Sequence, residues 1–125
     1  MIYGIGTDLV DLDRNWGNNF DRLCAKVLSS NELLLLDGLS ESHKKRVFAK
    51  QWACKESVAK ALGTGFVGKV IPSNMEILRD YMGKPVMIPC SQLRELMDQE
   101  GISKCHLSIS DTKNHVFSVA ILETV

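Results

Sequence analysis

The chain has 125 residues, of which 45% are hydrophobic and 24% are charged, and its formal net charge at pH 7 is zero. This composition predicts one globular domain over residues 1–125 and argues against a protein that coats nucleic acid, which would carry excess basic charge. The four cysteines lack the C-x-x-C spacing of zinc sites. There is neither a signal-peptide pattern nor an apolar run of about 20 residues, so we expect a cytoplasmic protein without membrane spans.

The first predicted element is a strand over residues 2–13, because apolar residues alternate between its two faces. Asp8 falls on the same face as Val10, and Gly4 and Gly6 precede it there. Glycines in a strand leave space for a ligand or for another backbone to approach closely. Two interpretations of Asp8 stay open: an acceptor of backbone N–H groups at a strand end, or a ligand of a divalent cation.

Helices are predicted next. A helix over 16–27 precedes a short helix over 31–37, whose start carries the capping-box pair Ser29 and Glu32. Ser40 is a suitable N-cap for the long helix that follows, which is the central element of the sequence.

This central helix ends at Gly63 and has a carboxylate within its apolar stripe. At about 100° per residue, Glu56 lies close to Trp52 on the helix surface. A buried carboxylate is costly unless it is paired or binds a metal. Glu56 therefore either pairs with Lys60 one turn later, worth about 0.2–0.5 kcal/mol, or converges with Asp8 on Mg²⁺ beside a substrate phosphate.

The second half of the chain reads as hairpins and one helix. Its expected elements are a loop at 64–73, strands at 75–79 and 86–88, a helix from 91 to about 101, and strands at 106–110 and 115–123. Helices mixed with antiparallel hairpins predict an α+β fold in which an antiparallel sheet packs against the long central helix.

Residues 63–69 match the G-x-G-x-x-G pattern and nearly match a Walker A loop. A dinucleotide-binding fingerprint is excluded because the glycines follow a helix rather than a strand. A Walker A loop is excluded because Val70 stands where Ser or Thr is required. Gly63 is a plausible helix C-cap, and a glycine loop with Lys69 could also admit a phosphate.

His106, Ser108 and Ser110 share one face of their predicted strand. A hydrolase is a poor explanation, since there is no G-x-S-x-G elbow. The row is either a solvated face or the polar lining of a phosphate or nucleotide cleft.

Basic residues gather before and at the start of the central helix. They are Arg14, Arg22, Lys26, Lys44, Lys45 and Arg46. They form either a solvated face or a docking surface for an acidic protein, where charge pairing raises the encounter rate more than the affinity.

Three stretches together resemble one family, the bacterial holo-[acyl-carrier-protein] synthases, the small class of 4′-phosphopantetheinyl transferases. Residues 4–11 resemble its G-I-G-x-D motif, residues 52–65 resemble its W/F-x-x-K-E-x-x-x-K-A-x-G-T-G signature, and residues 106–111 resemble its H-x-S-h-S-[HD] motif. Residues 83–85 match the family's G-K-P. The resemblance covers nearly the whole chain.

The resemblance implies that coenzyme A donates 4′-phosphopantetheine to a serine of apo-acyl carrier protein, in support of fatty acid biosynthesis. Asp8 and Glu56 are then expected to ligate Mg²⁺, with Glu56, Lys60 and His106 as catalytic residues. The coenzyme A pocket is assigned to Lys60, Gly63, Thr64, Gly65, Pro85, His106 and Ser108.

The resemblance also implies a homotrimer with each active site at a subunit interface. Arg14 and Arg22 fall where the family presents basic residues to the acidic carrier protein, and Lys26 belongs to the same docking set. Gln51 stands where many members have arginine, which predicts the loss of one phosphate or intersubunit contact. The alternatives are a non-catalytic module that docks an acidic helix, or another phosphate-handling enzyme on the same scaffold.

Overall fold

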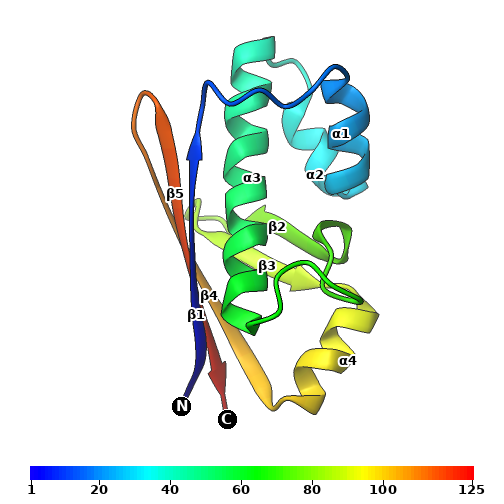
Figure 1. The fold of residues 1–125 in the computed structure, drawn as a ribbon, viewed down its shortest axis with the longest axis vertical. Coiled ribbons are helices and arrows are strands. Elements are labelled where there is room, and N and C mark those ends of the chain that lie inside the picture. The colour runs from blue at the N-terminus through cyan, green and yellow to red at the C-terminus, as the bar shows by residue number, and fades with distance from the viewer.

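The central element of the fold is α3 (Glu41–Leu62), which lies across one face of a three-stranded antiparallel sheet (Figure 1). The sheet has the order β1 (Ile2–Asp11), β5 (His115–Thr124), β4 (Ile102–Asp111). The computed structural model describes all of residues 1–125. The other elements are α1 (Phe20–Val27), α2 (Ser30–Leu33), η1 (Leu34–Leu36), η2 (Pro72–Asn74), β2 (Met75–Arg79), β3 (Pro85–Pro89) and α4 (Ser91–Gln99).

The α+β fold with an antiparallel sheet against a long central helix is confirmed. Ser40 caps α3 and Gly63 ends it in the left-handed region, with φ 84°. The capping box of Ser29 and Glu32 is present. The first helix begins at Phe20 rather than at residue 16, because the Asn19 side chain accepts the N–H of Arg22 and so fixes the cap there.

The glycines of β1 let the strand backbone touch the helix backbone. A Cβ atom on Gly6 would lie 1.9 Å from the carbonyl oxygen of Ser57, and one on Gly4 would lie 2.0 Å from that of Ala61. The space left by these strand glycines is therefore filled by another backbone, that of α3, and not by a ligand. On β5, Ser118 donates to a carbonyl of α3 and contacts the Ser57 hydroxyl.

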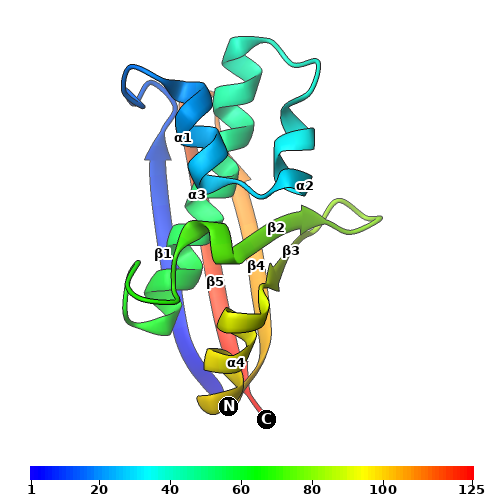
Figure 2. The ribbon, with the colours of Figure 1, turned by 90° about the vertical axis from the view of Figure 1, so that its right-hand side faces the viewer.

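Helix α3 is covered on most sides, which explains why apolar residues occur around much of its circumference. Its Ala49 and Ala53 face the sheet at Val10 and Val116. Phe48 packs instead into a cluster with α1 and η1 on the far side of the helix (Figure 2). No helix is both long and apolar enough to cross a membrane.

The other face of the sheet has no covering element. Apolar side chains are exposed there: Ile5 is 58% exposed, Leu9 64% and Phe117 40%. The strand register places Leu9 opposite Phe117 and Ile5 opposite Ile121, so these side chains form neighbouring pairs. We call this surface the outer sheet face.

Candidate active site

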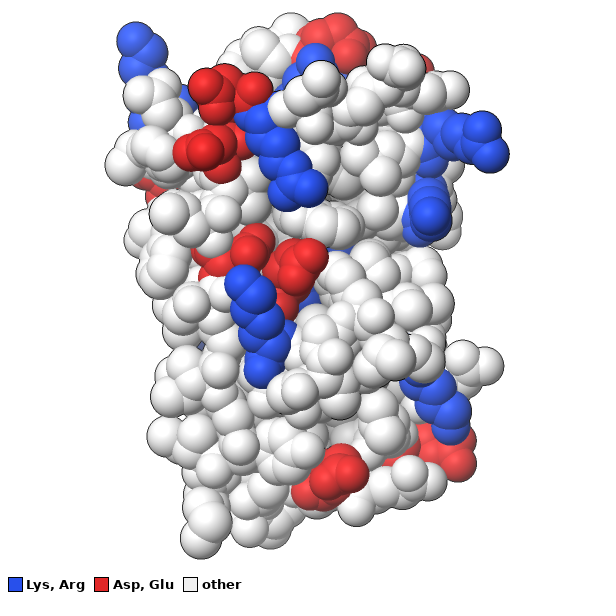
Figure 3. All heavy atoms as spheres, in the orientation of Figure 1, with Lys and Arg blue, Asp and Glu red and all other residues white.

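Asp8 and Lys60 meet where β1 crosses the last turns of α3. The Lys60 ammonium donates to Asp8 Oδ1 at 3.2 Å and to the Thr7 carbonyl at 3.0 Å. The expected face of Asp8 is confirmed, since Gly6 and Val10 on the same face are buried against the helix. In the space-filling view of the molecule, acidic side chains (red) and a basic side chain (blue) adjoin one another near the middle of the visible surface (Figure 3).

Glu56 lies one helical turn before Lys60 and is half-buried. Burial raises the pKa of the Glu56 carboxyl and the negative charge of Asp8 raises it further, while Lys60 and Arg14 oppose both effects. Burial also raises the pKa of Asp8, against the lowering influence of Lys60 and Arg14. The two carboxylates are therefore close enough for their charges to interact, and both are harder to ionise than free side chains.

Of the two interpretations of Glu56, the pair with Lys60 is not formed, because Lys60 forms its ion pair with Asp8. Glu56 is only half-buried, whereas Phe48 and Ala59 of the same stripe are fully buried. The strand supplies the partner of Lys60, which periodicity along a helix cannot reveal.

One carboxylate oxygen in this group has no partner. Asp8 Oδ2 is buried and accepts no hydrogen bond, which is costly for a charged oxygen. A divalent cation would satisfy it. Nowhere does the chain bring three or more acidic, His or Cys side chains together as a metal cage. Two carboxylates still fit Mg²⁺, which commonly takes one or two protein carboxylates together with waters and substrate phosphates.

The glycine loop begins one turn beyond Lys60. The N–H of Gly63 donates to the Lys60 carbonyl at 3.0 Å, and the N–H of Gly65 donates to a carbonyl of the same helix end. Gly65 also has positive φ, at 65°. Thr64 is exposed in this loop, and the predicted lining residues Gly63, Thr64 and Gly65 lie at the end of α3 that follows Lys60.

His106 and Ser108 lie on the opposite side of the sheet. Both are exposed, whereas the alternating Leu107 of β4 is buried toward α3. His106 pairs with Glu123 on the neighbouring strand β5. Within one chain these residues therefore cannot meet Asp8 and Glu56. Pro85 opens β3, in the hairpin that projects from the body of the molecule (Figure 2).

The basic residues expected to bind a partner lie around α1. Arg14 stacks on Trp16, with its guanidinium carbon 4.3 Å from the ring centroid, and approaches Trp52 at 5.8 Å. Arg22 and Lys26 are exposed one turn apart on α1. Beside them is a hollow of about 360 Å³, lined by Leu23, Lys26, Val27, Trp52, Ile71, Pro72 and Ser73. We call it the α1 hollow.

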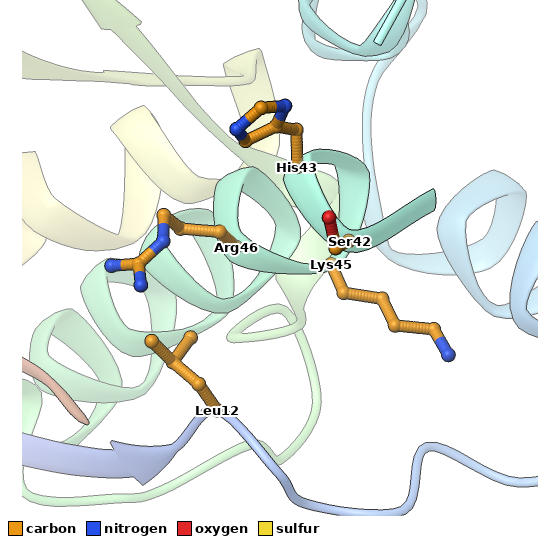
Figure 4. A pocket seen from close by; sticks show the side chains of 5 residues that line it. All are labelled: Leu12, Ser42, His43, Lys45 and Arg46. Atoms are coloured by element: carbon orange, nitrogen blue, oxygen red, sulfur yellow. The ribbon is translucent and has the colours of Figure 1, made fainter. Parts of the chain in front are cut away.

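The remaining basic residues do not converge. A hollow at the start of α3 is lined by Leu12, Ser42, His43, Lys45 and Arg46. Lys45 and Arg46 point to opposite sides of it (Figure 4). Arg46 is held by Asp111 and by the carbonyls of Thr112 and Lys113, so it joins α3 to the β4–β5 turn.

Comparison with known proteins identifies the family of the chain. The family model of the 4′-phosphopantetheinyl transferase superfamily matches residues 4–120. The chain belongs to this superfamily. Among relatives, holo-[acyl-carrier-protein] synthases of Geotalea daltonii and Nitrosomonas europaea are 37% and 40% identical to it, over 98% of this chain and 99% of each relative.

Solved structures from the superfamily match the whole fold. The holo-[acyl-carrier-protein] synthase of Neisseria meningitidis has a TM-score of 0.88 at 35% identity, covering 99% of this chain and 100% of that one. The Bacillus anthracis synthase, solved in complex with CoA (3′,5′-ADP), has a TM-score of 0.84 at 31% identity, with 100% and 99% covered.

A buried cluster of three polar side chains was not predicted from the sequence. Lys55, Glu32 and Gln51 are all 0% exposed. Gln51 donates to Glu32 Oε2 and to the Ile77 carbonyl, both at 2.6 Å. Gln51 points into the protein interior, so it makes no contact with a phosphate or another subunit in this chain. The predicted loss of the contact that arginine makes in other members stays a prediction. The signal available in the sequence was the capping-box Glu32 alone.

Proposed function

We propose that this protein transfers 4′-phosphopantetheine from coenzyme A to a serine of apo-acyl carrier protein, releasing adenosine 3′,5′-bisphosphate. The observation that carries the proposal is the group of Asp8, Glu56 and Lys60, with a buried unpaired oxygen on Asp8. It occurs in a chain that aligns over nearly its full length with holo-[acyl-carrier-protein] synthases. The holo-carrier product would serve fatty acid biosynthesis.

We further propose that Asp8 and Glu56 hold Mg²⁺. Bound there, the ion would supply charge neutralisation for the pyrophosphate of coenzyme A. The unpaired Oδ2 of Asp8 and the interacting charges of the two carboxylates support this assignment. Asp8 is fixed by β1 and Glu56 by α3, so both ligands would be supplied by rigid elements.

Lys60 would act on the same phosphates. Its side chain is half exposed, so the ammonium is reachable from solvent while Asp8 and the Thr7 carbonyl orient it. From that position it can donate to phosphate oxygens as negative charge develops on the leaving bisphosphate, or transfer a proton to it. The adjacent loop of Gly63, Thr64 and Gly65 would line the coenzyme A pocket.

We propose that His106, Ser108 and Pro85 act from a second copy of the chain in a homotrimer. His106 and Ser108 lie on the sheet face opposite to Asp8, so one chain alone does not bring them to the carboxylates. The exposed apolar outer sheet face provides a surface that self-association would bury. A cyclic arrangement would place His106 of one copy near Asp8 of the next.

Carrier protein would dock on Arg14, Arg22 and Lys26. The α1 hollow beside Lys26 has mostly apolar walls, which suits an apolar side chain protruding from an acidic surface. Arg14 would serve two purposes, because its charge also lowers the pKa of both site carboxyls. Arg22 is therefore the cleaner test of docking.

Arg22→Glu should raise the KM for carrier protein by about tenfold, while the KM for coenzyme A stays near the wild-type value. Rising salt should reduce the difference between the two proteins, because it screens exposed charges. Steady-state kinetics at two ionic strengths would measure this. Arg94→Glu, on α4, is the matched control and should behave like wild type. Equal changes in both KM values would rule out docking at Arg22.

The function itself is tested by intact-mass spectrometry of apo-acyl carrier protein incubated with this protein, coenzyme A and Mg²⁺. We expect a gain of about 340 Da, the mass of one phosphopantetheine arm, that disappears with EDTA. A carrier that keeps its mass under all conditions, with several carriers tested, would favour the non-catalytic docking module. A gain that persists in EDTA would leave the reaction standing and remove the metal.

A further inference from the structure

Lys55 is a fully buried lysine whose three ammonium hydrogens all have acceptors. Its Nζ donates to the Val27 carbonyl at 2.9 Å, to the Pro72 carbonyl at 2.8 Å and to Glu32 Oε1 at 2.7 Å. Burial lowers the pKa of Lys55 and the adjacent Glu32 charge opposes that effect. The ammonium group has no part in the site of Asp8, Glu56 and Lys60, although it belongs to the residue directly before Glu56.

The two carbonyls that Lys55 binds belong to opposite walls of the α1 hollow. Val27 is the last residue of α1, and Pro72 opens η2. Both line the hollow. No hydrogen bond joins α1 directly to residues 64–74, so Lys55 is the only residue hydrogen-bonded to both walls.

The other polar groups of the cluster hold Lys55 in place. Glu32 Oε1 also accepts the N–H of Ser29, which is its capping-box bond, and Oε2 accepts from Gln51. Gln51 Oε1 is buried without a partner. Buried ion pairs rarely add net stability compared with apolar residues of the same size. The cluster is therefore better explained by the geometry that it imposes on its neighbours.

We propose that Lys55 is a positioning residue for carrier-protein recognition, because it fixes the spacing between α1 and residues 71–73 across the α1 hollow. This inference rests on the proposed function. Without the ammonium, the nearest remaining hydrogen bonds between the two segments would be those of Ser29 and Asn31 with Glu76, beyond the ends of the walls. Lys26 on α1 would lose its fixed position relative to Trp52 and Ile71. The carboxylate–lysine group would keep its geometry, since β1 and α3 hold it independently of α1.

The test compares two variants of the full chain. The double variant Glu32→Gln/Lys55→Met removes the ammonium without leaving an unpaired buried charge. Glu32→Gln alone keeps the Lys55 bonds to Val27 and Pro72. We expect the double variant to raise the KM for carrier protein by about tenfold, with kcat and the KM for coenzyme A within about twofold of wild type. Glu32→Gln should keep the wild-type KM for carrier protein despite lower thermal stability.

A purely structural role predicts a different pattern. In that case the KM for carrier protein would follow the loss of stability, and Glu32→Gln or the core control Ile102→Val, buried in the sheet, would raise it too. That result, or an unchanged KM in the double variant, would overturn the proposal. Measuring wild type in parallel distinguishes failure of this proposal from failure of the proposed function. If wild type loads no carrier protein, the proposed function itself is contradicted.

Discussion

Glu56→Gln should lower kcat for carrier modification by about 100-fold or more while the protein remains folded. Glutamine keeps the size of the side chain but removes the charge that we assign to Mg²⁺. Asp8→Asn should have the same effect, and the remaining activity should no longer respond to Mg²⁺ concentration. The measurement is the initial rate of carrier modification across a Mg²⁺ titration, with both substrates saturating.

The stability of Glu56→Gln provides an independent check. The folded-state pKa of Glu56 is raised, so ionisation at neutral pH opposes folding in the metal-free protein, and this cost is absent at pH values below the ordinary carboxyl range. The metal-free variant should therefore unfold at a temperature no lower than wild type at pH 7. Glu41→Gln, on the same helix but exposed, is the activity control. A wild-type rate at saturating Mg²⁺ would exclude Glu56 from the metal site.

Mixing two inactive variants, Glu56→Gln and His106→Ala, should restore activity. If each site takes its carboxylates from one copy and its histidine from the next, random trimers of equal amounts recover about a quarter of the wild-type rate. The reason is that His106 and Asp8 lie on opposite faces of the sheet. Co-expression with two affinity tags, or mixing in mild denaturant followed by refolding, would prepare the mixed trimers.

Two controls make this result specific. Glu56→Gln mixed with Asp8→Asn should not recover activity, since both changes remove ligands that come from the same copy. Leu9→Lys, on the outer sheet face, should yield monomers by sedimentation and no activity, because the exposed apolar pairs there are proposed to be buried in the trimer. Full activity in a monomeric Leu9→Lys protein would show that one chain suffices.

Local signals predicted the elements best. Ser40 and Gly63 mark the ends of α3, and each supplies its cap through a contact within a few residues. The strand parity of Asp8 correctly grouped it with Gly6 and Val10, because residues two apart share a face. The same parity grouped His106 with Ser108, but alternation does not reveal which of the two faces is covered.

The long-range hydrogen-bond partners of the two lysines could not be predicted. Lys60 pairs with Asp8, 52 positions away, although Glu56 was available one turn earlier. No local pattern marked Lys55 as buried, whereas residues 23 and 28 positions away accept its hydrogen bonds. Such pairings depend on which distant segments pack together in the fold. The periodicity of a single sequence does not show this.

If Asp8 and Glu56 hold a metal as proposed, the backbone contact of Gly4 and Gly6 with α3 would bear on which ion is held. The separation between Asp8 and Glu56 depends on the spacing of strand and helix, and that spacing is already at its minimum. A minimal spacing suits the short ligand distances of Mg²⁺, about 2.0–2.1 Å, better than the 2.3–2.6 Å of Ca²⁺. With Mg²⁺ held as proposed, two residues without side chains would take part in choosing the ion, and any residue larger than glycine would widen the site toward larger cations.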